Sequence, residues 1–362
     1  MFPFYTQDKI RAIDAKFEAQ RIAFAPLSFQ AAIALRDLGI LAEVSANKDG
    51  VTTSALAEKL SLSLYGVGVL AEMGLGMGVL KLAPGSSEED LKYTLGKTGY
   101  FLLKDEMTLV NMNFSQDVCY EGAKALTESV KNGKPEGLKF FGTWKTVYEA
   151  LSQLPPPVQK SWFEFDHFYS DLAFPEALPV VFRKKYNTLF DIGGNTAKWS
   201  IACCKYDSQV KVTIIDLPGQ TAVAEKNIAE AGFSDRISTH ATNVLDKESK
   251  FPQGAEAVWM SQFLDCFSLE EITRIVSKVR ESITNETDVF VLEPLWDMQR
   301  FEAASYSLQA TSLYFTCIAN GNSKMYRFKE LTNAIEAGGF ELKEANHNLG
   351  INSYSLLRFQ KK

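Results

Sequence analysis

The chain has 362 residues, enough for two domains, and 46% of them are hydrophobic, so a substantial core and an aromatic pocket can form. Its formal net charge of −6 argues against nucleic acid as a partner, because that binding depends on neutralising phosphates. Five cysteines, an odd number without metal-ligand spacing, indicate a reducing compartment and no metal site.

The first fourteen residues do not have the pattern of a signal peptide. They lack an apolar core and carry four charged side chains, at Asp8, Lys9, Arg11 and Asp14. No stretch has the roughly 18 consecutive apolar residues of a membrane span. We therefore expect a cytoplasmic protein that does not contact a membrane.

Residues 1 to about 105 have the pattern of a winged helix. Apolar residues recur at helical spacing over 29–44, and hydroxyl side chains at 52–54 can cap a second helix. A third helix is predicted over 62–78. A strand, a polar turn and a second strand are predicted over 78–95, as in a wing.

A winged helix commonly binds DNA, and the charges weigh against that function here. The helix around residues 63–75 has no Lys or Arg to contact phosphates or base edges. The turn of the wing carries Glu88, Glu89 and Asp90, which would repel DNA. We expect no nucleic-acid partner. A winged-helix regulator with a ligand-sensing domain stays as a competing hypothesis.

The segment over 106–182 is predicted to be mostly helical, with a break at the three prolines 155–157. A helix expected over 161–171 is rich in aromatic side chains. Such side chains most often pack in a core, so composition alone assigns them no role.

From residue 183 onward, strands and helices alternate, which is typical of a doubly wound α/β sheet. We expect parallel strands over 187–192, 210–216, 237–243, 257–261 and 288–293, and an antiparallel pair over 340–343 and 353–360. Ligands of such sheets bind at the carboxyl ends of the strands. Polar residues stand at these ends: Asp191, Asp216, Asn243, Ser261 and Glu293.

The turn after the first of these strands indicates a nucleotide site. Asp191 precedes Gly193 and Gly194, which we expect to let the backbone approach a ligand. About 20 residues later the second strand ends at Asp216, whose two oxygens can accept both hydroxyls of a ribose. The chain does not have the G-x-G-x-x-G spacing of a pyrophosphate site, and this disfavours a nicotinamide oxidoreductase. The acid before the glycines suits a cationic ligand, S-adenosylmethionine; a turn without a ligand is the plainer alternative.

Five motifs, in this order, resemble the dimeric small-molecule O-methyltransferases of plants and bacteria, the group with caffeate, acetylserotonin and polyketide-tailoring enzymes. They are DIGGNTA from residue 191, where the family usually has D-V-G-G-G-x-G, then IIDLP, WMSQFLDCFSLEE, VFVLEP and AGGF. The resemblance covers nearly the whole chain. It implies a homodimer with a winged-helix dimerisation domain (1–105), a helical linker with substrate-lining helices (106–182) and a Rossmann-like domain that binds S-adenosylmethionine (183–362).

The resemblance also implies roles for single residues. It implies a small hydroxylated, aromatic acceptor lined by Trp162, His167, Tyr314 and Phe315. It implies that the cofactor S-adenosylmethionine is bound by Asp191, Gly193, Gly194, Asp216, Leu217, Asn243, Val244 and Ser261.

The catalytic motif departs from the family. The family has L-H-D-W, in which the histidine is the base, and this chain has Asp265 at the histidine position. Glu293 matches the first of two acids that orient that histidine, and the second, expected near residues 325–326, is missing. An aspartate with a pKa near 4 is a poor base unless burial raises the pKa, as the apolar neighbours of Asp265 would. Three readings stay open: Asp265 is a base of raised pKa, the acceptor arrives already ionised, or the chain binds S-adenosylmethionine without methylating by the family mechanism.

Overall fold

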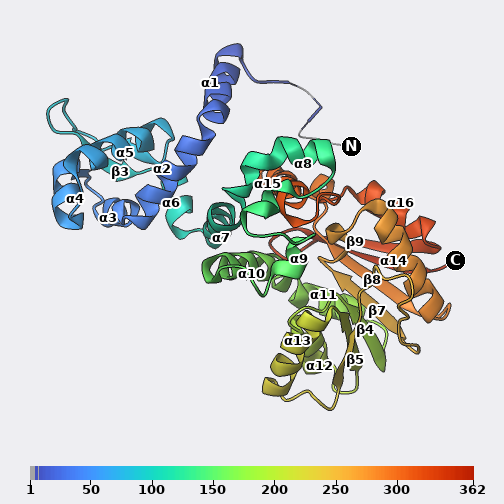
Figure 1. Ribbon diagram of the computed structural model, residues 1–362. Coiled ribbons are helices and arrows are strands. Elements are labelled where there is room, and N and C mark those ends of the chain that lie inside the picture. Colours follow the sequence, from blue (N-terminus) through green and yellow to red (C-terminus); the bar gives the residue numbers. More distant parts are fainter. Residues whose placement is uncertain (1–4, 7) are drawn as a thin grey trace. The chain divides into compact units, whose positions relative to one another are not determined.

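A computed structural model describes residues 5–6 and 8–362 of the chain (Figure 1). Residues 1–4 and 7, which belong to the N-terminal segment for which we expect no signal peptide, lie outside the described residues. The chain forms two compact units, which divide between Gln116 and Asp117. The domain limits that we expect at residues 105 and 182 stay predictions.

The N-terminal unit is helical with a three-stranded antiparallel sheet of order β1-β3-β2, which confirms the helical, winged-helix-like prediction. Hydroxyl side chains begin two helices: Thr52 accepts from the Ala55 amide at 3.2 Å and Ser63 from the Gly66 amide at 3.4 Å. The elements are α1 (Ala12–Ala23), α2 (Ala25–Asp37), α3 (Ile40–Ala46), β1 (Val51–Thr52), α4 (Thr53–Leu60), α5 (Leu64–Gly76), β2 (Leu80–Leu82), β3 (Lys92–Leu95), α6 (Lys97–Lys104) and α7 (Glu106–Phe114).

A helical segment precedes the large sheet of the C-terminal unit. Its last two helices, α10 and α11, lead directly into the first strand. The first helical turn, η1 (Ser115–Cys119), contains the point at which the chain divides into the two units. The other elements are η2 (Gly122–Ala125), α8 (Leu126–Asn132), η3 (Glu136–Phe140), α9 (Val147–Ala150), α10 (Pro156–Asp171) and α11 (Phe174–Val181).

The sheet has seven strands in the order β6-β5-β4-β7-β8-β10-β9. The first five strands pair in parallel, and β10 pairs antiparallel with both β8 and β9. This confirms the doubly wound α/β fold with a closing hairpin. The strands are β4 (Thr188–Ile192), β5 (Lys211–Asp216), β6 (Ile237–Ala241), β7 (Ala257–Ser261), β8 (Asp288–Glu293), β9 (Phe340–Leu349) and β10 (Tyr354–Lys361).

Helices cover both faces of this sheet. In Figure 1, α12 and α13 lie on one side of the strands, and α14 and α16 lie on the other. The remaining elements are α12 (Lys198–Tyr206), α13 (Pro218–Glu230), η4 (Leu264–Cys266), α14 (Leu269–Ser282), η5 (Trp296–Met298), α15 (Glu302–Tyr314), η6 (Phe315–Ala319) and α16 (Phe328–Ala337). The strand order reverses between β4 and β7, so the ligand of such a fold is expected at their carboxyl ends.

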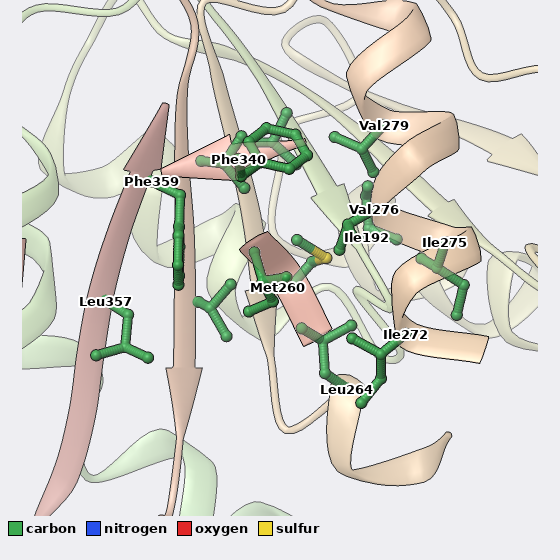
Figure 2. Packing of buried hydrophobic residues seen from close by; sticks show 14 of the residues in the cluster. Ile192, Met260, Leu264, Ile272, Ile275, Val276, Val279, Phe340, Leu357 and Phe359 are labelled. Carbon is green, nitrogen blue, oxygen red and sulfur yellow. The ribbon is translucent and has the colours of Figure 1, made fainter. Parts of the chain in front are cut away.

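A buried apolar cluster fills the space between the sheet and helices α14 and α16. Figure 2 shows Leu264 of the short turn η4 within this cluster, together with Met260 of β7 and Ile272 of α14. Leu264 is fully buried, so the turn that carries its neighbour Asp265 is fixed to the core.

Candidate active site

The glycine turn connects β4 to α12 and packs tightly against the protein itself. Gly193 has a φ of +78°, and a Cβ there would lie 2.3 Å from a ring carbon of Phe263. A Cβ at Gly194 would lie 2.8 Å from Ile214 and 2.9 Å from the Asp191 carboxylate. From the sequence we expected glycines here so that a ligand could approach the backbone. In the structure, the neighbouring side chains of the protein itself already leave no room for a larger residue at either position.

The same turn keeps a left-handed backbone at two residues that are not glycine. Asn195 has a φ of +46° and Ala197 a φ of +70°, at positions where the resembled motif has glycines. Such a conformation costs roughly 1–2 kcal/mol in a residue with a Cβ. Asn195 gains compensating bonds, because its amide N–H donates to Asp216 at 2.9 Å and its side-chain nitrogen donates to Asp166 at 3.2 Å.

Asp216 stands at the tip of β5 with its carboxylate oriented by the backbone. One oxygen accepts from the Leu217 amide at 2.7 Å and the other from the Asn195 amide at 2.9 Å. Burial raises the pKa of Asp216, and these two amide bonds oppose that rise. Each oxygen keeps a lone pair for a ligand hydroxyl.

A cavity opens beside the glycine turn. Five residues expected to contact cofactor or acceptor line it: Asp191, Gly193, Gly194, Ser261 and His167. Sequence reasoning missed the other side chains of its wall, namely Asp166, Asp171, Phe174, Asn195, Thr196, Lys198, Trp199, Trp259 and Gln262.

Asp191 and Asn243 differ in how accessible they are. Asp191 is 2% exposed and accepts from the Ser200 hydroxyl at 2.6 Å, and burial raises its pKa to about 7. Asn243 is exposed, and its side-chain oxygen accepts from the Leu245 amide at 2.9 Å. Val244 packs in the core cluster, so only its backbone is available to a ligand.

Four hydrogen bonds hold the turn that carries Asp265. One carboxylate oxygen of Glu293 accepts from the amides of Phe263, at 3.1 Å, and Leu264, at 2.9 Å. The Tyr326 hydroxyl donates to the Phe267 carbonyl at 2.6 Å, and the Asn320 side chain donates to the Cys266 carbonyl at 2.7 Å. Tyr326 thus stabilises the turn from the region where the resembled family has its second acid.

Asp265 does not cap the following helix. Ser268 caps α14 in a reciprocal arrangement with Glu271, so the Asp265 carboxyl is available for another role. Asp265 is 5% exposed, and burial raises its pKa to about 7. Burial and then the charge of Asp265 raise the pKa of Glu293 well above its ordinary value.

Asp265 lies within electrostatic reach of the cavity wall. Burial raises the pKa of Asp166 to about 7, and the charge of Asp265 is the next cause. Tyr354 of β10 is fully buried, and its hydroxyl makes no hydrogen bond to any residue that the structure describes. Burial and the charges of Asp265, Glu293 and Asp166 raise the pKa of this phenol.

Two families of protein domains match this chain. Residues 16–86 match the Dimerisation2-like domain, and residues 124–341 match the O-methyltransferase domain. The chain belongs to the O-methyltransferase domain family. It is therefore an enzyme, a methyltransferase that uses S-adenosylmethionine, and it carries a dimerisation domain.

Relatives and a solved structure agree with this membership. The L-tyrosine C(3)-methyltransferase of Streptomyces lavendulae is 25% identical over 323 residues, 88% of this chain and 85% of that enzyme. The 3-hydroxy-5-methyl-1-naphthoate 3-O-methyltransferase of Streptomyces sahachiroi is 28% identical over 138 residues, 38% of this chain and 39% of that enzyme. The S-adenosylmethionine-dependent methyltransferase SibL has a similar fold, with a TM-score of 0.70 at 21% identity, covering 94% of this chain and 98% of SibL.

The methyltransferase has a cavity wall that fits a polar, charged cofactor. Trp199 and Trp259 are stacked, with ring centroids 3.7 Å apart and planes 10° apart, and neither indole N–H has a partner among the described residues. The Ser261 hydroxyl and the Gln262 side-chain oxygen are likewise buried without a partner there. Unpaired buried polar atoms cost roughly 1–3 kcal/mol each, so a polar ligand that pairs some of them is favoured.

The methyltransferase brings together three of the four residues expected at the acceptor. The Trp162 indole of α10 donates to the Tyr314 hydroxyl of α15 at 2.7 Å, and the Phe315 ring lies 5.4 Å from that of Tyr314. His167 lies instead in the wall of the cavity beside the glycine turn, with its Nδ1 4.0 Å from Asp171. Burial and then the charge of Lys198 lower the pKa of His167.

No helix in residues 5–6 and 8–362 of the methyltransferase has the length and apolar character needed to cross a membrane.

Proposed function

We propose that this methyltransferase transfers the methyl group of S-adenosylmethionine to a hydroxyl of a small aromatic molecule, with Asp265 as the base. The observation that carries the proposal is the buried Asp265 carboxyl, whose pKa of about 7 suits proton transfer at neutral pH. The aromatic side chains Trp162, Tyr314 and Phe315 support an aromatic acceptor. So do the names of two relatives, which act on L-tyrosine and on a hydroxynaphthoate.

The proposed roles combine the contacts of the residues with the roles that the family resemblance implies. S-adenosylmethionine supplies a methyl group activated by a positively charged sulfur. Asp265 takes the proton that the acceptor hydroxyl loses, and Glu293 positions Asp265 through the amides of Phe263 and Leu264. Asp216 accepts the ribose hydroxyls. The further cofactor contacts that we propose are Asp191, Gly193, Gly194, Leu217, Asn243, Ser261 and the backbone of Val244.

The direct test is methyl transfer from S-adenosylmethionine with a deuterated methyl group. We expect L-tyrosine, a hydroxynaphthoate or a related phenol to gain the labelled methyl on oxygen, as seen by mass spectrometry and by NMR of the product. A chain that binds S-adenosylmethionine but labels none of a broad panel of phenols would contradict the proposal. That result would favour the reading in which the chain does not methylate by the family mechanism.

Methylation at carbon is the second candidate. The relative that spans 88% of this chain is a C(3)-methyltransferase, whereas the naphthoate O-methyltransferase spans 38%. A base that deprotonates a phenol also activates the ring carbon beside the oxygen, so the same Asp265 would serve. In the labelling experiment, a product that keeps its phenolic hydroxyl and loses an aromatic C–H would favour this candidate.

We further propose a homodimer built mainly by the N-terminal unit. Helix α1 buries none of its side chains, and Ile13 and Phe17 on it are 67% and 55% exposed. A second copy of the chain would cover them; Phe17 lies within the dimerisation domain over residues 16–86, and Ile13 lies just before it. Dimer interfaces of this obligate kind commonly bury about 2,000 Å² or more.

The proposed dimer should dissociate more readily when charged side chains are introduced on helix α1. The wild type should scatter light as a dimer at micromolar concentration, and Ile13→Asp with Phe17→Asp should raise the dissociation constant, because burying two carboxylates is costly. Ile351→Asp, which changes a residue that is 73% exposed in the other unit, is the matched control and should stay dimeric. A monomeric wild type, or a double variant as dimeric as the control, would contradict this interface.

A further inference from the structure

The cavity beside the glycine turn has an unbalanced charge. Asp166, Asp171 and Asp191 line it, and Lys198 is the one Lys or Arg among the described side chains of its wall. Lys198 forms an ion pair with Asp171. Asp166 accepts a hydrogen bond from the Asn195 side chain at 3.2 Å but forms no ion pair with any basic side chain in the described part of the chain. Asp166 is therefore an acid of the cavity wall that no basic side chain of the described residues pairs with directly.

The surroundings of Asp166 oppose its ionised form when no ligand is present. Burial is the largest cause of its raised pKa, and the charges of Asp265 and Asp171 add to it, whereas Lys198 and Asn195 oppose it. A ligand cation would reverse this balance by pairing with the carboxylate. Trp199 and Trp259, 3% and 0% exposed, contribute unpaired indole N–H groups in the same wall. Both features point to a charged, polar ligand group.

We propose that Asp166 binds the α-ammonium group of S-adenosylmethionine. Asn195 connects Asp166 to the proposed ribose site, because its amide N–H bonds to Asp216 and its side chain bonds to Asp166. A cofactor whose ribose lies at Asp216 carries its amino-acid end only a few bonds away. The α-ammonium donates hydrogen bonds and the sulfonium does not, so the ammonium is the better partner for a carboxylate that already accepts an amide N–H.

The inference rests on the use of S-adenosylmethionine and not on the acceptor or on Asp265. Its test therefore measures binding rather than turnover. Two ligands separate the parts of the cofactor: S-adenosylhomocysteine carries the α-ammonium but no sulfonium, and 5′-methylthioadenosine carries adenine, ribose and sulfur but no amino-acid end. Calorimetry gives both affinities directly, and quenching of tryptophan fluorescence gives them again.

We expect Asp166→Asn to weaken S-adenosylhomocysteine binding by at least about tenfold, because a hydrogen bond to a charged group is lost. The same variant should bind 5′-methylthioadenosine as the wild type does, which also shows that it is folded. Asp216→Ala should weaken both ligands by about tenfold, since both carry the ribose. Glu164→Gln, which changes an exposed acid of the same helix, is the matched control and should change neither affinity.

Three results would overturn the proposal. An unchanged affinity of Asp166→Asn for S-adenosylhomocysteine would mean that Asp166 does not bind the α-ammonium group and serves another ligand, such as the acceptor. With S-adenosylmethionine measured as a third ligand, a loss of affinity for it alone would assign Asp166 to the sulfonium. An equal loss for S-adenosylhomocysteine and 5′-methylthioadenosine would mean general damage to the site. Failure of the ribose assignment is separate, because it would appear as unchanged affinities in Asp216→Ala.

Discussion

Asp265→Asn should lower kcat by a factor of about 100 or more while its affinity for S-adenosylhomocysteine stays unchanged. The factor is the lower end of what a positioned general base contributes. An amide has nearly the size of the carboxylate but cannot take up the proton that the hydroxyl of the methyl acceptor loses. The cofactor contacts are untouched, because the described wall of the cavity includes Ser261 and Gln262 but not Asp265.

The pH dependence gives this prediction a second readout. The base is the ionised form of Asp265, so kcat at saturating S-adenosylmethionine and acceptor should rise as the pH passes upward through about 7. Below that value the carboxyl is protonated and turnover falls. Asp265→Asn should lose this dependence. Saturating both ligands matters, because burial raises the pKa of Asp166 and Asp191 to about 7 as well.

Glu270→Gln is the matched control for Asp265→Asn, since Glu270 is an exposed acid in the first turn of α14. It should keep the wild-type kcat and pH profile. Normal turnover by Asp265→Asn would mean that the acceptor reaches the site already ionised. A wild-type kcat that does not change between about pH 6 and pH 8 would equally exclude a base with this pKa.

The ends of the strands were predictable from sequence because the physical signal there is local. Strands of a parallel sheet are buried on both faces, so β4, β7 and β8 read as short apolar runs that stop at a polar residue. Parallel strands place their carboxyl ends at one edge. That edge holds Asp216, Ser261 and Glu293, each the last residue of its strand.

Contacts between distant segments were not predictable in the same way. Asp166 meets Asn195, and Trp199 stacks on Trp259, but helical periodicity only tells which face of a helix is apolar and not which distant side chain it meets. The role of Tyr326 was hidden for another reason. The resembled family has an acid in this region and this chain has none, whereas a phenol that donates to the Phe267 carbonyl holds the same turn.

Asp288→Asn should lower the free energy of unfolding of the C-terminal unit by about 3 kcal/mol, the lower end for breaking a buried ion pair. Asp288 begins β8 and is 3% exposed. One of its carboxylate oxygens accepts from Tyr186 at 2.8 Å and Lys184 at 3.2 Å, and the other accepts from Arg358 at 3.1 Å and Gln360 at 2.9 Å. The lower end applies because the side chains of Lys184 and Arg358 are 54% and 28% exposed and can turn to water.

Urea denaturation followed by tryptophan fluorescence measures this effect in one unit alone. All five tryptophans lie between residues 144 and 296, so the N-terminal unit contributes no signal. Glu230→Gln removes an exposed pair with Lys226 and is the control, with an expected change below about 0.5 kcal/mol. If the urea unfolding transition of Asp288→Asn coincided with that of the control, the hydrogen bonds of Asp288 would not have the stabilising role proposed for them.

The pH dependence of the Asp288→Asn effect has a definite sign. Burial alone would raise the pKa of Asp288, but its bonds to Tyr186, Lys184 and Arg358 outweigh burial and hold the pKa below its ordinary value. A carboxyl with a lowered folded-state pKa stabilises the fold above its unfolded pKa of about 3.9 and loses that contribution as the pH falls through the folded value. The difference between wild type and Asp288→Asn should therefore be constant from about pH 7 to pH 5 and shrink below about pH 4. A difference that grows on acidification would show that Asp288 is not stabilised as an anion by these three side chains.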